Sequence, residues 1–203
     1  NILVIRTDRI GDVVLTTPAI KALHKAYPLA RITVMLAPLT KDLLSPCPYI
    51  KEIMLDERQG RHKGLLGFLQ LARDIRFKNF DAVFIFHTKR RYNLACFLAG
   101  VLMRIGYRND KFGFLLTHPL IDMRPKGEKH EAQYCLDVLK GVGIDAKGLD
   151  LFVASSKEAE NWANQWLIDQ GLVAGEFIAI HTGSSDPAKC WPIENFTKLI
   201  EQI

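Results

Sequence analysis

The stretch NILVIRTDRIGDVVLTTPAIKALHKAYP, residues 1–28, decides the fold. Ile2–Ile5 is a run of branched apolar residues, and we predict a buried β-strand over Ile2–Arg6. Pro18–Tyr27, or the whole stretch from Asp12, predicts a helix, because its apolar residues recur at helical spacing. The loop between them ends in Gly11-Asp12. This order places Asp12 at the carboxyl edge of the first strand, where open α/β sheets bind ligands.

The alternation of strands and helices continues to about residue 150. Asp81–His87 (DAVFIFH) is nearly all apolar, as is typical of a strand covered on both faces of a parallel sheet. Gly64–Arg76 carries its apolar residues on one face and predicts an amphipathic helix. The fold class is therefore α/β with a doubly wound parallel sheet. Further strands are expected at 31–37, 50–55 and 103–107, and further helices at 40–44, 93–102 and 129–142.

The pattern restarts after residue 152, with a helix to Gln170, a strand at Phe177–His181 and a helix from Pro192. The sequence ends at Ile203, inside that last helix. A helix–strand–helix piece alone can scarcely bury a core. We therefore expect residues 1–152 to form one domain, and residues 153–203 to be a linker and the beginning of a second, truncated domain.

The composition, 48% apolar and 24% charged, is that of an ordinary soluble globular protein. The longest apolar stretch, Leu94–Met103, is too short to span a bilayer, and the chain opens without a basic leader. Its four cysteines form no CxxC pair and no zinc spacing with histidine, which predicts reduced thiols in a cytoplasmic protein and no metal site. They are Cys47, Cys96, Cys135 and Cys190.

The net charge of +5 suggests an anionic partner, which nucleic acid, an anionic membrane or a phosphorylated substrate would each satisfy. A solvated surface is the simpler interpretation of any single basic cluster, so charge alone does not choose between these. No basic stretch with interleaved stacking aromatics supports nucleic acid. The clusters are Arg58-Arg61-Lys63, Lys89-Arg90-Arg91, Arg104-Arg108-Lys111 and Arg124-Lys126-Lys129.

The first loop with candidate functional residues is Arg6–Pro18. Gly11 suits a tight turn, and Asp12 has two interpretations: an N-cap of the helix that follows, or a general base. The loop lacks the GxGxxG pattern of dinucleotide-binding folds and the lysine of a Walker motif. The second loop is His181–Pro192, where Gly183-Ser184-Ser185 and Lys189 suit a diphosphate. A plain surface turn set by Asp186-Pro187 explains it equally well.

Together, GDVVLTTPAIKALHKAYP (residues 11–28) and IAIHTGSSDPAKCWPIENFTKLI (178–200) resemble the bacterial heptosyltransferase family of lipopolysaccharide core biosynthesis, glycosyltransferase family 9. KHEAQYCLDVLKGVGI (129–144) is similar to the segment that precedes this family's interdomain linker. The resemblance implies the GT-B fold, in which two Rossmann-like domains bind the acceptor and the nucleotide-sugar respectively. It also implies an inverting transfer that needs no metal and no other cofactor.

Carried over by this resemblance, Asp12 is the catalytic base, and Lys189, Ser184, Ser185 and Gly183 bind the donor's phosphates. The implied donor is ADP-heptose, and the implied acceptor is Kdo-lipid A or a heptosyl derivative, both anionic. We expect acceptor contacts from the loops that follow the strands, and peripheral contact with the inner membrane. The family's further donor loops are expected beyond Ile203, so this chain alone is expected to be inactive. The expected acceptor-binding residues are Gly11, Arg58, Arg61, Lys89, Arg90 and Arg91.

Three other functions stay open at this point: a different nucleotide-sugar enzyme or an oxidoreductase, a nucleic-acid-binding module, and a non-catalytic Rossmann-like domain. The missing GxGxxG argues against nicotinamide binding. We expect His87 to be a hydrogen-bonding residue at a strand end, His181 to be structural, and Trp191 to pack beneath its loop.

Overall fold

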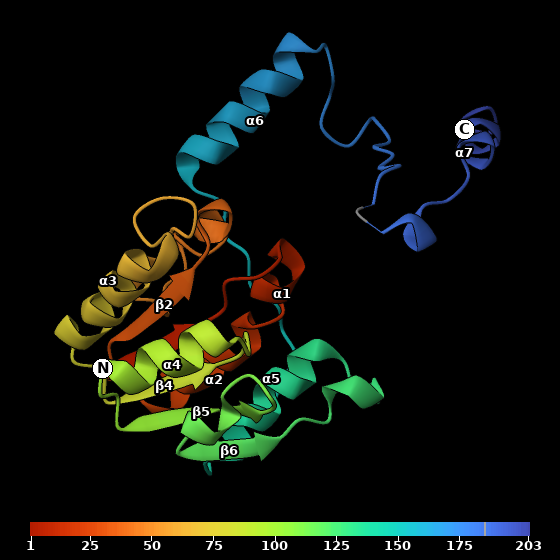
Figure 1. The fold of residues 1–203 in the computed structure, drawn as a ribbon. Coiled ribbons are helices and arrows are strands. Elements are labelled where there is room, and N and C mark those ends of the chain that lie inside the picture. Colours follow the sequence, from red (N-terminus) through yellow and green to blue (C-terminus); the bar gives the residue numbers. More distant parts are fainter. Residues whose placement is uncertain (185) are drawn as a thin grey trace. The chain divides into compact units, whose positions relative to one another are not determined.

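The computed structural model describes residues 1–203 except residue 185. The chain divides into two compact units, residues 1–156 and 157–203, which are described separately below. In Figure 1 the first unit runs from red to teal along the sequence, and the second is blue.

The first unit is built on a parallel six-stranded sheet in the order β3-β2-β1-β4-β5-β6. β1 lies inside the sheet, where Val4 is in register with Val34 on one side and Phe84 on the other. The predicted doubly wound parallel sheet is thereby confirmed. The strands are β1 (Ile2–Ile5), β2 (Ile32–Leu36), β3 (Glu52–Leu55), β4 (Ala82–Ile85), β5 (Met103–Arg108) and β6 (His118–Ile121).

Helices cover both faces of this sheet (Figure 1). Successive strand residues point to opposite faces. Val4 therefore packs in the core beneath α2 and α5, while Leu3 and Ile5 pack in the core beneath α3 and α4. The helices of this unit are α1 (Ile10–Val14), α2 (Thr17–Ala26), α3 (Gly64–Phe77), α4 (Arg90–Leu98) and α5 (Glu131–Lys140), with 3-10 turns at Pro38–Leu43, Gly113–Leu115 and Arg124–Lys126.

Two local differences from the predicted elements have physical causes. The helix expected from Asp12 onward is divided into α1 and α2, because Pro18 has no amide hydrogen to continue the ladder. At the break, the Thr16 hydroxyl donates a hydrogen bond of 2.9 Å to the Asp12 carbonyl. β6 was not predicted, since it is short and contains Pro119, which a strand tolerates at the edge of a sheet.

The second unit contains α6 (Lys157–Asp169), a 3-10 turn at Pro187–Lys189 and α7 (Ile193–Ile200). The strand predicted at Phe177–His181 is wrong for this structure, whose described residues there form no strand. An isolated strand has no neighbour to satisfy its amides and carbonyls, so the segment stays irregular. None of the described residues in this unit is buried.

Candidate functional site

Asp12 lies at the carboxyl edge of β1, as expected, but it does not cap its helix. The N-cap of α1 is Arg9, so Asp12 stands inside the first turn and the N-cap interpretation is wrong. Its side chain is 32% exposed, and its Oδ1 lies 2.9 Å from Nη2 of Arg6. Among the described residues no hydrogen bond reaches Oδ2. Within the described residues, a cation therefore fixes one oxygen of this carboxylate and not the other.

Gly11 also differs from its predicted role. Gly11 was expected to allow a tight turn of the loop, but it lies within α1 and has no positive φ. A Cβ at this position would meet nothing within 4 Å, so the space beside Gly11 is open. Its lack of a side chain keeps that space clear next to Asp12.

Arg6, which the sequence analysis did not select, organises this edge. Its side chain is 3% exposed and contacts three carboxylates: Asp8 at 2.9 Å, Asp12 at 2.9 Å and Glu131 at 3.0 Å. Glu131 comes from the first turn of α5. Burial lowers the pKa of Arg6, but Cys135 and the three carboxylates outweigh it and hold that pKa above its usual value. Arg6 therefore stays a cation. In the sequence it is marked only as the single charged residue at the end of a predicted buried strand.

A second buried charge cluster follows β3 and contains Asp56, whose side chain is 0% exposed. Arg91 binds it with both ends of its guanidinium, at 3.0 Å to Oδ2 and 2.9 Å to Oδ1. Nε of Arg58 lies 3.1 Å from Oδ2, and the Tyr92 hydroxyl donates to the same oxygen at 2.9 Å. Burial raises the pKa of Asp56, but the bonds from Arg91 and its neighbours prevail and lower it. The carboxylate is therefore ionised. It neutralises part of the positive charge of Arg58 and Arg91, which were predicted from the sequence to bind an anionic ligand.

The predicted acceptor-binding cations thus fall into two groups. Arg58 and Arg91 pair with Asp56, and Arg61 lies 2.8 Å from Asp74. In the part of the chain that the structure describes, no ion pair engages Lys89 or Arg90. Internal pairing does not remove Arg58 from solvent, since its side chain is still 45% exposed.

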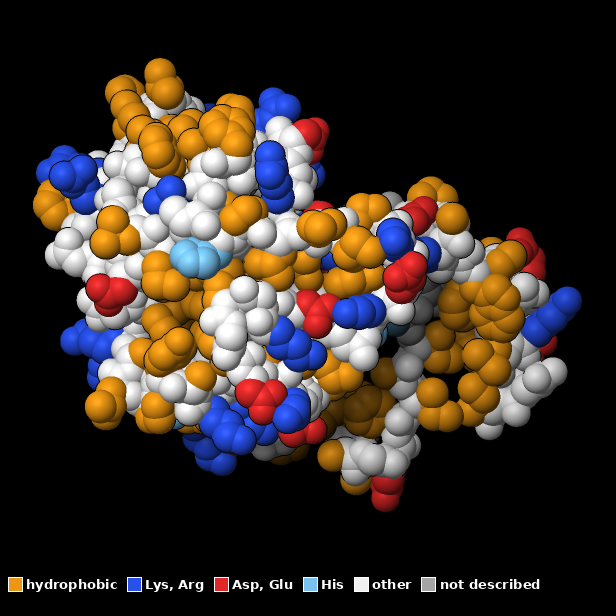
Figure 2. All heavy atoms as spheres, turned by 90° about the horizontal axis from the view of Figure 1, so that it is seen from below, with side chains coloured by type: hydrophobic (Ala, Val, Ile, Leu, Met, Phe, Trp, Pro, Cys, Tyr) orange, Lys and Arg blue, Asp and Glu red, His pale blue; other side chains and the backbone are white. Residues whose placement is uncertain are grey.

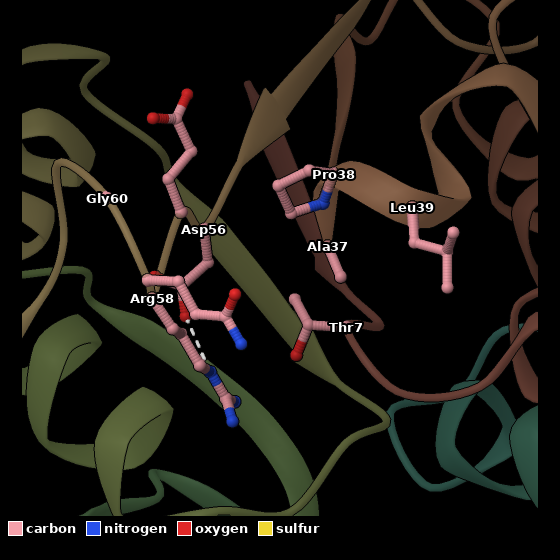
Figure 3. Close-up of a pocket in the computed structure, with 9 residues that line it drawn as sticks. Thr7, Ala37, Pro38, Leu39, Asp56, Arg58 and Gly60 are labelled. Carbon is pink, nitrogen blue, oxygen red and sulfur yellow. Dashed lines mark hydrogen bonds and ion pairs between the residues drawn. The ribbon is translucent and has the colours of Figure 1, made fainter.

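A pocket of about 670 Å³ opens where β1, β2 and β3 end (Figure 3). Thr7, Pro38 and Leu39 line it opposite the Asp56–Gly60 segment, and the Arg58–Asp56 ion pair forms part of its wall. The pocket therefore combines apolar side chains with one paired arginine.

A neighbouring pocket of about 390 Å³ shares Arg58 with the first and is more basic. Its other lining residues are Lys89, Arg90, Arg91, Asp110 and Lys111. Four of the five predicted acceptor-binding cations meet here: Arg58, Lys89, Arg90 and Arg91. Lys111 joins them from a loop that the sequence analysis noted as basic but did not include in the site. This pocket has the charge to hold an anionic group.

His87 follows β4 at the carboxyl edge of the sheet. Its Nδ1 is 2.9 Å from the Thr7 hydroxyl, which confirms the prediction that it is a hydrogen-bonding residue. Burial first, and then the nearby Lys89, Arg6, Arg58 and Lys111, lower the pKa of His87 to about 3. The ring is therefore neutral near neutral pH.

The predicted donor loop lies in the second unit. Gly183, Ser184 and Lys189 are exposed, whereas Ser185 lies outside the described residues. The Asp186 carboxylate accepts a hydrogen bond of 3.1 Å from the Ala188 amide, and the Lys189 amide donates to the Asp186 carbonyl at 2.9 Å. Asp186 thus fixes a tight turn, whose last residue is Lys189. Trp191 contacts the Phe196 ring, with 5.0 Å between ring centres.

Neither a metal site nor a membrane span is found among the described residues. They contain no group of three His, Cys, Asp or Glu side chains arranged to hold an ion. Likewise, none of the helices in the described part of the chain is long and apolar enough to cross a bilayer. All four cysteines are free, and Cys190 is the exposed one.

Sequence comparison finds relatives over the full length of the chain. A Haemophilus influenzae protein that bears the name of a glycosyltransferase is 27% identical over 210 residues, covering 100% of this chain and 60% of that protein. Lipopolysaccharide heptosyltransferase 3 of Escherichia coli K12 is 24% identical, covering 95% of this chain and 57% of that protein. The chain is a relative of bacterial glycosyltransferases. The resemblance stated from the two motifs is therefore confirmed, although no family model matches the chain.

Solved structures agree with this glycosyltransferase relationship. The glycosyl transferase family 9 structure from Veillonella parvula matches with a TM-score of 0.87 and 27% identity, over 98% of this chain and 58% of that one. E. coli ADP-heptose lipopolysaccharide heptosyltransferase II matches in fold, with a TM-score of 0.69 at 22% identity, over 100% of this chain and 60% of that one. The glycosyltransferase-like chain thus spans about 60% of the length of the relatives it matches.

Proposed function

We propose that this chain carries the acceptor-binding half of an inverting glycosyltransferase that moves a heptose from ADP-heptose to an anionic lipopolysaccharide inner-core acceptor. The observation that carries the proposal is the state of Asp12 at the carboxyl edge of β1. Its carboxylate is part-exposed, fixed through one oxygen by buried Arg6, and bordered by the open space at Gly11. The names of the relatives support the class of reaction and the class of donor.

In the proposed reaction, Oδ2 of Asp12 accepts the proton of the acceptor hydroxyl as that oxygen attacks the anomeric carbon of the donor sugar. The bond from that carbon to the diphosphate breaks, and ADP leaves with the electron pair. Arg6 does not touch the substrate; it orients Asp12 through the contact to Oδ1. A base placed in this way typically contributes about 10²–10⁴ in rate.

The anionic acceptor has a suitable partner in the basic pocket. Lys89, Arg90 and Lys111 line it, and none of them has an ion-pair partner in the described chain. We assign them to acceptor phosphate or carboxylate groups, with Arg58 and Arg91 contributing through their exposed edges. Arg61 is a weaker candidate, since Asp74 binds it. For the donor, Lys189, Ser184, Ser185 and Gly183 are proposed to hold the diphosphate, and residues 153–203 to begin the nucleotide-sugar domain.

The test follows acceptor-dependent ADP release in the longest natural polypeptide that contains this chain. ADP-heptose is the donor, and Kdo-lipid A or heptosyl-Kdo-lipid A is the acceptor. Asp12→Asn is expected to lower kcat by about 10²–10⁴ with little change in KM, because it removes the proton acceptor and keeps the shape. Asp42→Asn, an exposed carboxylate elsewhere in the unit, is the matched control.

Each outcome has a distinct meaning. Release that Asp12→Asn leaves unchanged would remove Asp12 as the base. No release with either acceptor would mean that the chain acts on another nucleotide-sugar, or that it binds without catalysis. The 203-residue chain by itself is expected to show no turnover, and measurable turnover from it would contradict the assignment of the remaining donor contacts to residues outside it.

A further inference from the structure

The positive charge of this protein is concentrated in one segment. Residues 61–104 contain nine Lys and Arg and two Asp, a net charge of +7, whereas the whole chain has a net charge of +5. The rest of the chain is therefore slightly acidic. This segment forms α3, β4 and α4, so its two helices make up the layer on one side of the sheet (Figure 1).

The outward face of α3 is apolar as well as basic. Leu65, Leu66 and Phe77 are 74%, 82% and 69% exposed, and Leu69 is 49% exposed. These side chains are not part of the core, which α3 reaches through Leu71, Ala72 and Ile75 on its other side. A helix that leaves four large apolar side chains in water on one face has an unsatisfied hydrophobic surface.

The charged side chains on that face are arginines. Arg73 and Arg76 are exposed among the leucines, and the Arg73 guanidinium lies 5.2 Å from the centre of the Phe77 ring. Asp74, the acidic residue of this helix, is half-buried and bound by Arg61 and Gln70. No ion pair engages Arg73 or Arg76 among the described residues. The face is therefore cationic without internal compensation.

The same character continues along the end of α4. Phe97, Leu98 and Leu102 are exposed there, and the Arg104 guanidinium lies 5.5 Å from the centre of the Phe97 ring. Figure 2, which views the molecule from below, shows hydrophobic side chains interspersed with Lys and Arg on that face as well. We call the exposed side chains of α3 together with this end of α4 the α3–α4 surface.

We propose that the α3–α4 surface binds the plane of an anionic membrane. Leucine and phenylalanine side chains enter the boundary between headgroups and acyl chains, and arginines beside them bind lipid phosphates, as in amphipathic helices that lie in the interface. Long arginine side chains suit this arrangement, because their stems cover apolar surface while their charges reach the phosphates. The inference goes beyond the proposed sugar transfer and does not depend on it.

Membrane is favoured over nucleic acid and over a second copy of the chain by the combination of groups. Nucleic acid rewards cations and stacking rings but gains little from exposed leucines. A second copy would place the unpaired arginines of one face against those of its partner. An anionic lipid surface satisfies the apolar and the cationic side chains together.

The test is sedimentation with vesicles of 70% phosphatidylethanolamine and 30% phosphatidylglycerol in about 0.1 M salt, where exposed charges are screened beyond roughly 10 Å. It uses the longest natural polypeptide that contains this chain. We expect binding to these vesicles and at least tenfold weaker binding to phosphatidylcholine. The double variants Leu65→Ser/Leu66→Ser and Arg73→Gln/Arg76→Gln are each expected to weaken binding at least tenfold. Leu29→Ser, which changes a 99% exposed leucine elsewhere, and Lys21→Gln/Lys25→Gln on α2 are expected to stay within twofold.

Equal partitioning of wild type and the two test variants would overturn the proposal, as would wild type that does not sediment with anionic vesicles. Two further measurements identify rival occupants. If Leu65→Ser/Leu66→Ser converts a dimer into a monomer in analytical ultracentrifugation, the surface is an interface between copies. If Arg73→Gln/Arg76→Gln abolishes binding to DNA or RNA and leaves vesicle binding intact, the surface serves nucleic acid. Retained circular dichroism in each variant shows that a loss of binding is not a loss of fold.

Discussion

Arg6 affects the candidate site without reaching solvent, and this gives it a testable role. Replacing it leaves Asp8, Asp12 and Glu131 close together without their shared cation. Breaking a buried ion pair from one side typically costs about 3–5 kcal/mol. Since all three of these carboxylates are partly solvated, we expect Arg6→Gln to lower the free energy of unfolding by about 2–3 kcal/mol, measured by urea denaturation.

A positioning role predicts more than lost stability. In the proposed transferase, Arg6→Gln should lower kcat with little change in the KM for the acceptor, because Asp12 loses the cation that holds its Oδ1 in place. Arg6→Lys keeps the charge and should restore part of kcat, although its single ammonium cannot hold three carboxylates as the guanidinium does. An unchanged kcat in Arg6→Gln would reduce Arg6 to a structural residue.

His87 makes the stability of the first unit depend on pH. Its pKa is about 3 in the folded protein, against an ordinary value of 6.5. Between these values the unfolded chain binds a proton that the folded chain does not, so the free energy of unfolding falls as pH drops from 6.5 towards 3. His87→Gln should flatten this part of the pH–stability curve in urea denaturation. His118→Gln, which removes an exposed imidazole, is the matched control.

The sequence placed some of these side chains and could not place others. Asp12 was predicted at the sheet edge, because the position of a residue after a buried strand follows from the strand alone. The partners of Asp56 could not be predicted in this way. Arg91 is 35 positions away on another element, and no periodicity brings the two together. A basic residue without an evident partner in the sequence is therefore not necessarily unpaired in the folded protein, as Arg91 shows.

Among the elements, α3 depends on a close backbone approach. A Cβ on Gly67 would lie 2.3 Å from the backbone carbon of His62, in the turn that precedes the helix. Gly67→Ala should therefore lower the free energy of unfolding by about 1–3 kcal/mol, since backbone rather than a side-chain tip must move. The measurement is thermal or urea unfolding followed by circular dichroism. Stability equal to wild type would show that the turn at Arg61-His62 yields easily.

Gly11 supplies the matched comparison in α1. Its added Cβ would meet nothing, and alanine favours helix over glycine, so Gly11→Ala should raise stability by up to about 1 kcal/mol. If the acceptor occupies the space beside Asp12, as proposed, the same variant should raise the KM for acceptor several-fold. Unchanged acceptor kinetics in a more stable Gly11→Ala protein would place the acceptor elsewhere.

The elements that were predicted well are those whose pattern is local. β1 and β4 are buried on both faces and read as continuous apolar runs. β6 forms because β5 provides backbone groups for it to pair with. Its own sequence, HPLI, does not predict a strand. The converse holds for Phe177–His181, whose strand-like sequence lacks a neighbouring strand in this structure. Strand formation depends on a partner as well as on propensity.

At the scale of the whole molecule, the two units differ in what holds them together. The first has two cores on opposite faces of its sheet, while no described residue of the second is buried. All three tryptophans lie in the second unit, where Trp162, Trp166 and Trp191 are 69%, 45% and 50% exposed. Tryptophan fluorescence therefore reports on the second unit alone, and circular dichroism is dominated by the first.

This separation predicts the behaviour of the 203-residue chain during denaturation. Its tryptophan emission should already be that of indole in water, and should change little across the urea transition that abolishes its circular dichroism. In a longer natural polypeptide that supplies strands beside Phe177–His181, emission should lie at shorter wavelength and shift on unfolding, because apolar side chains such as Ile178 gain a core. Short-wavelength emission from the 203-residue chain, lost together with its circular dichroism, would instead show that its second unit packs its apolar residues without further chain.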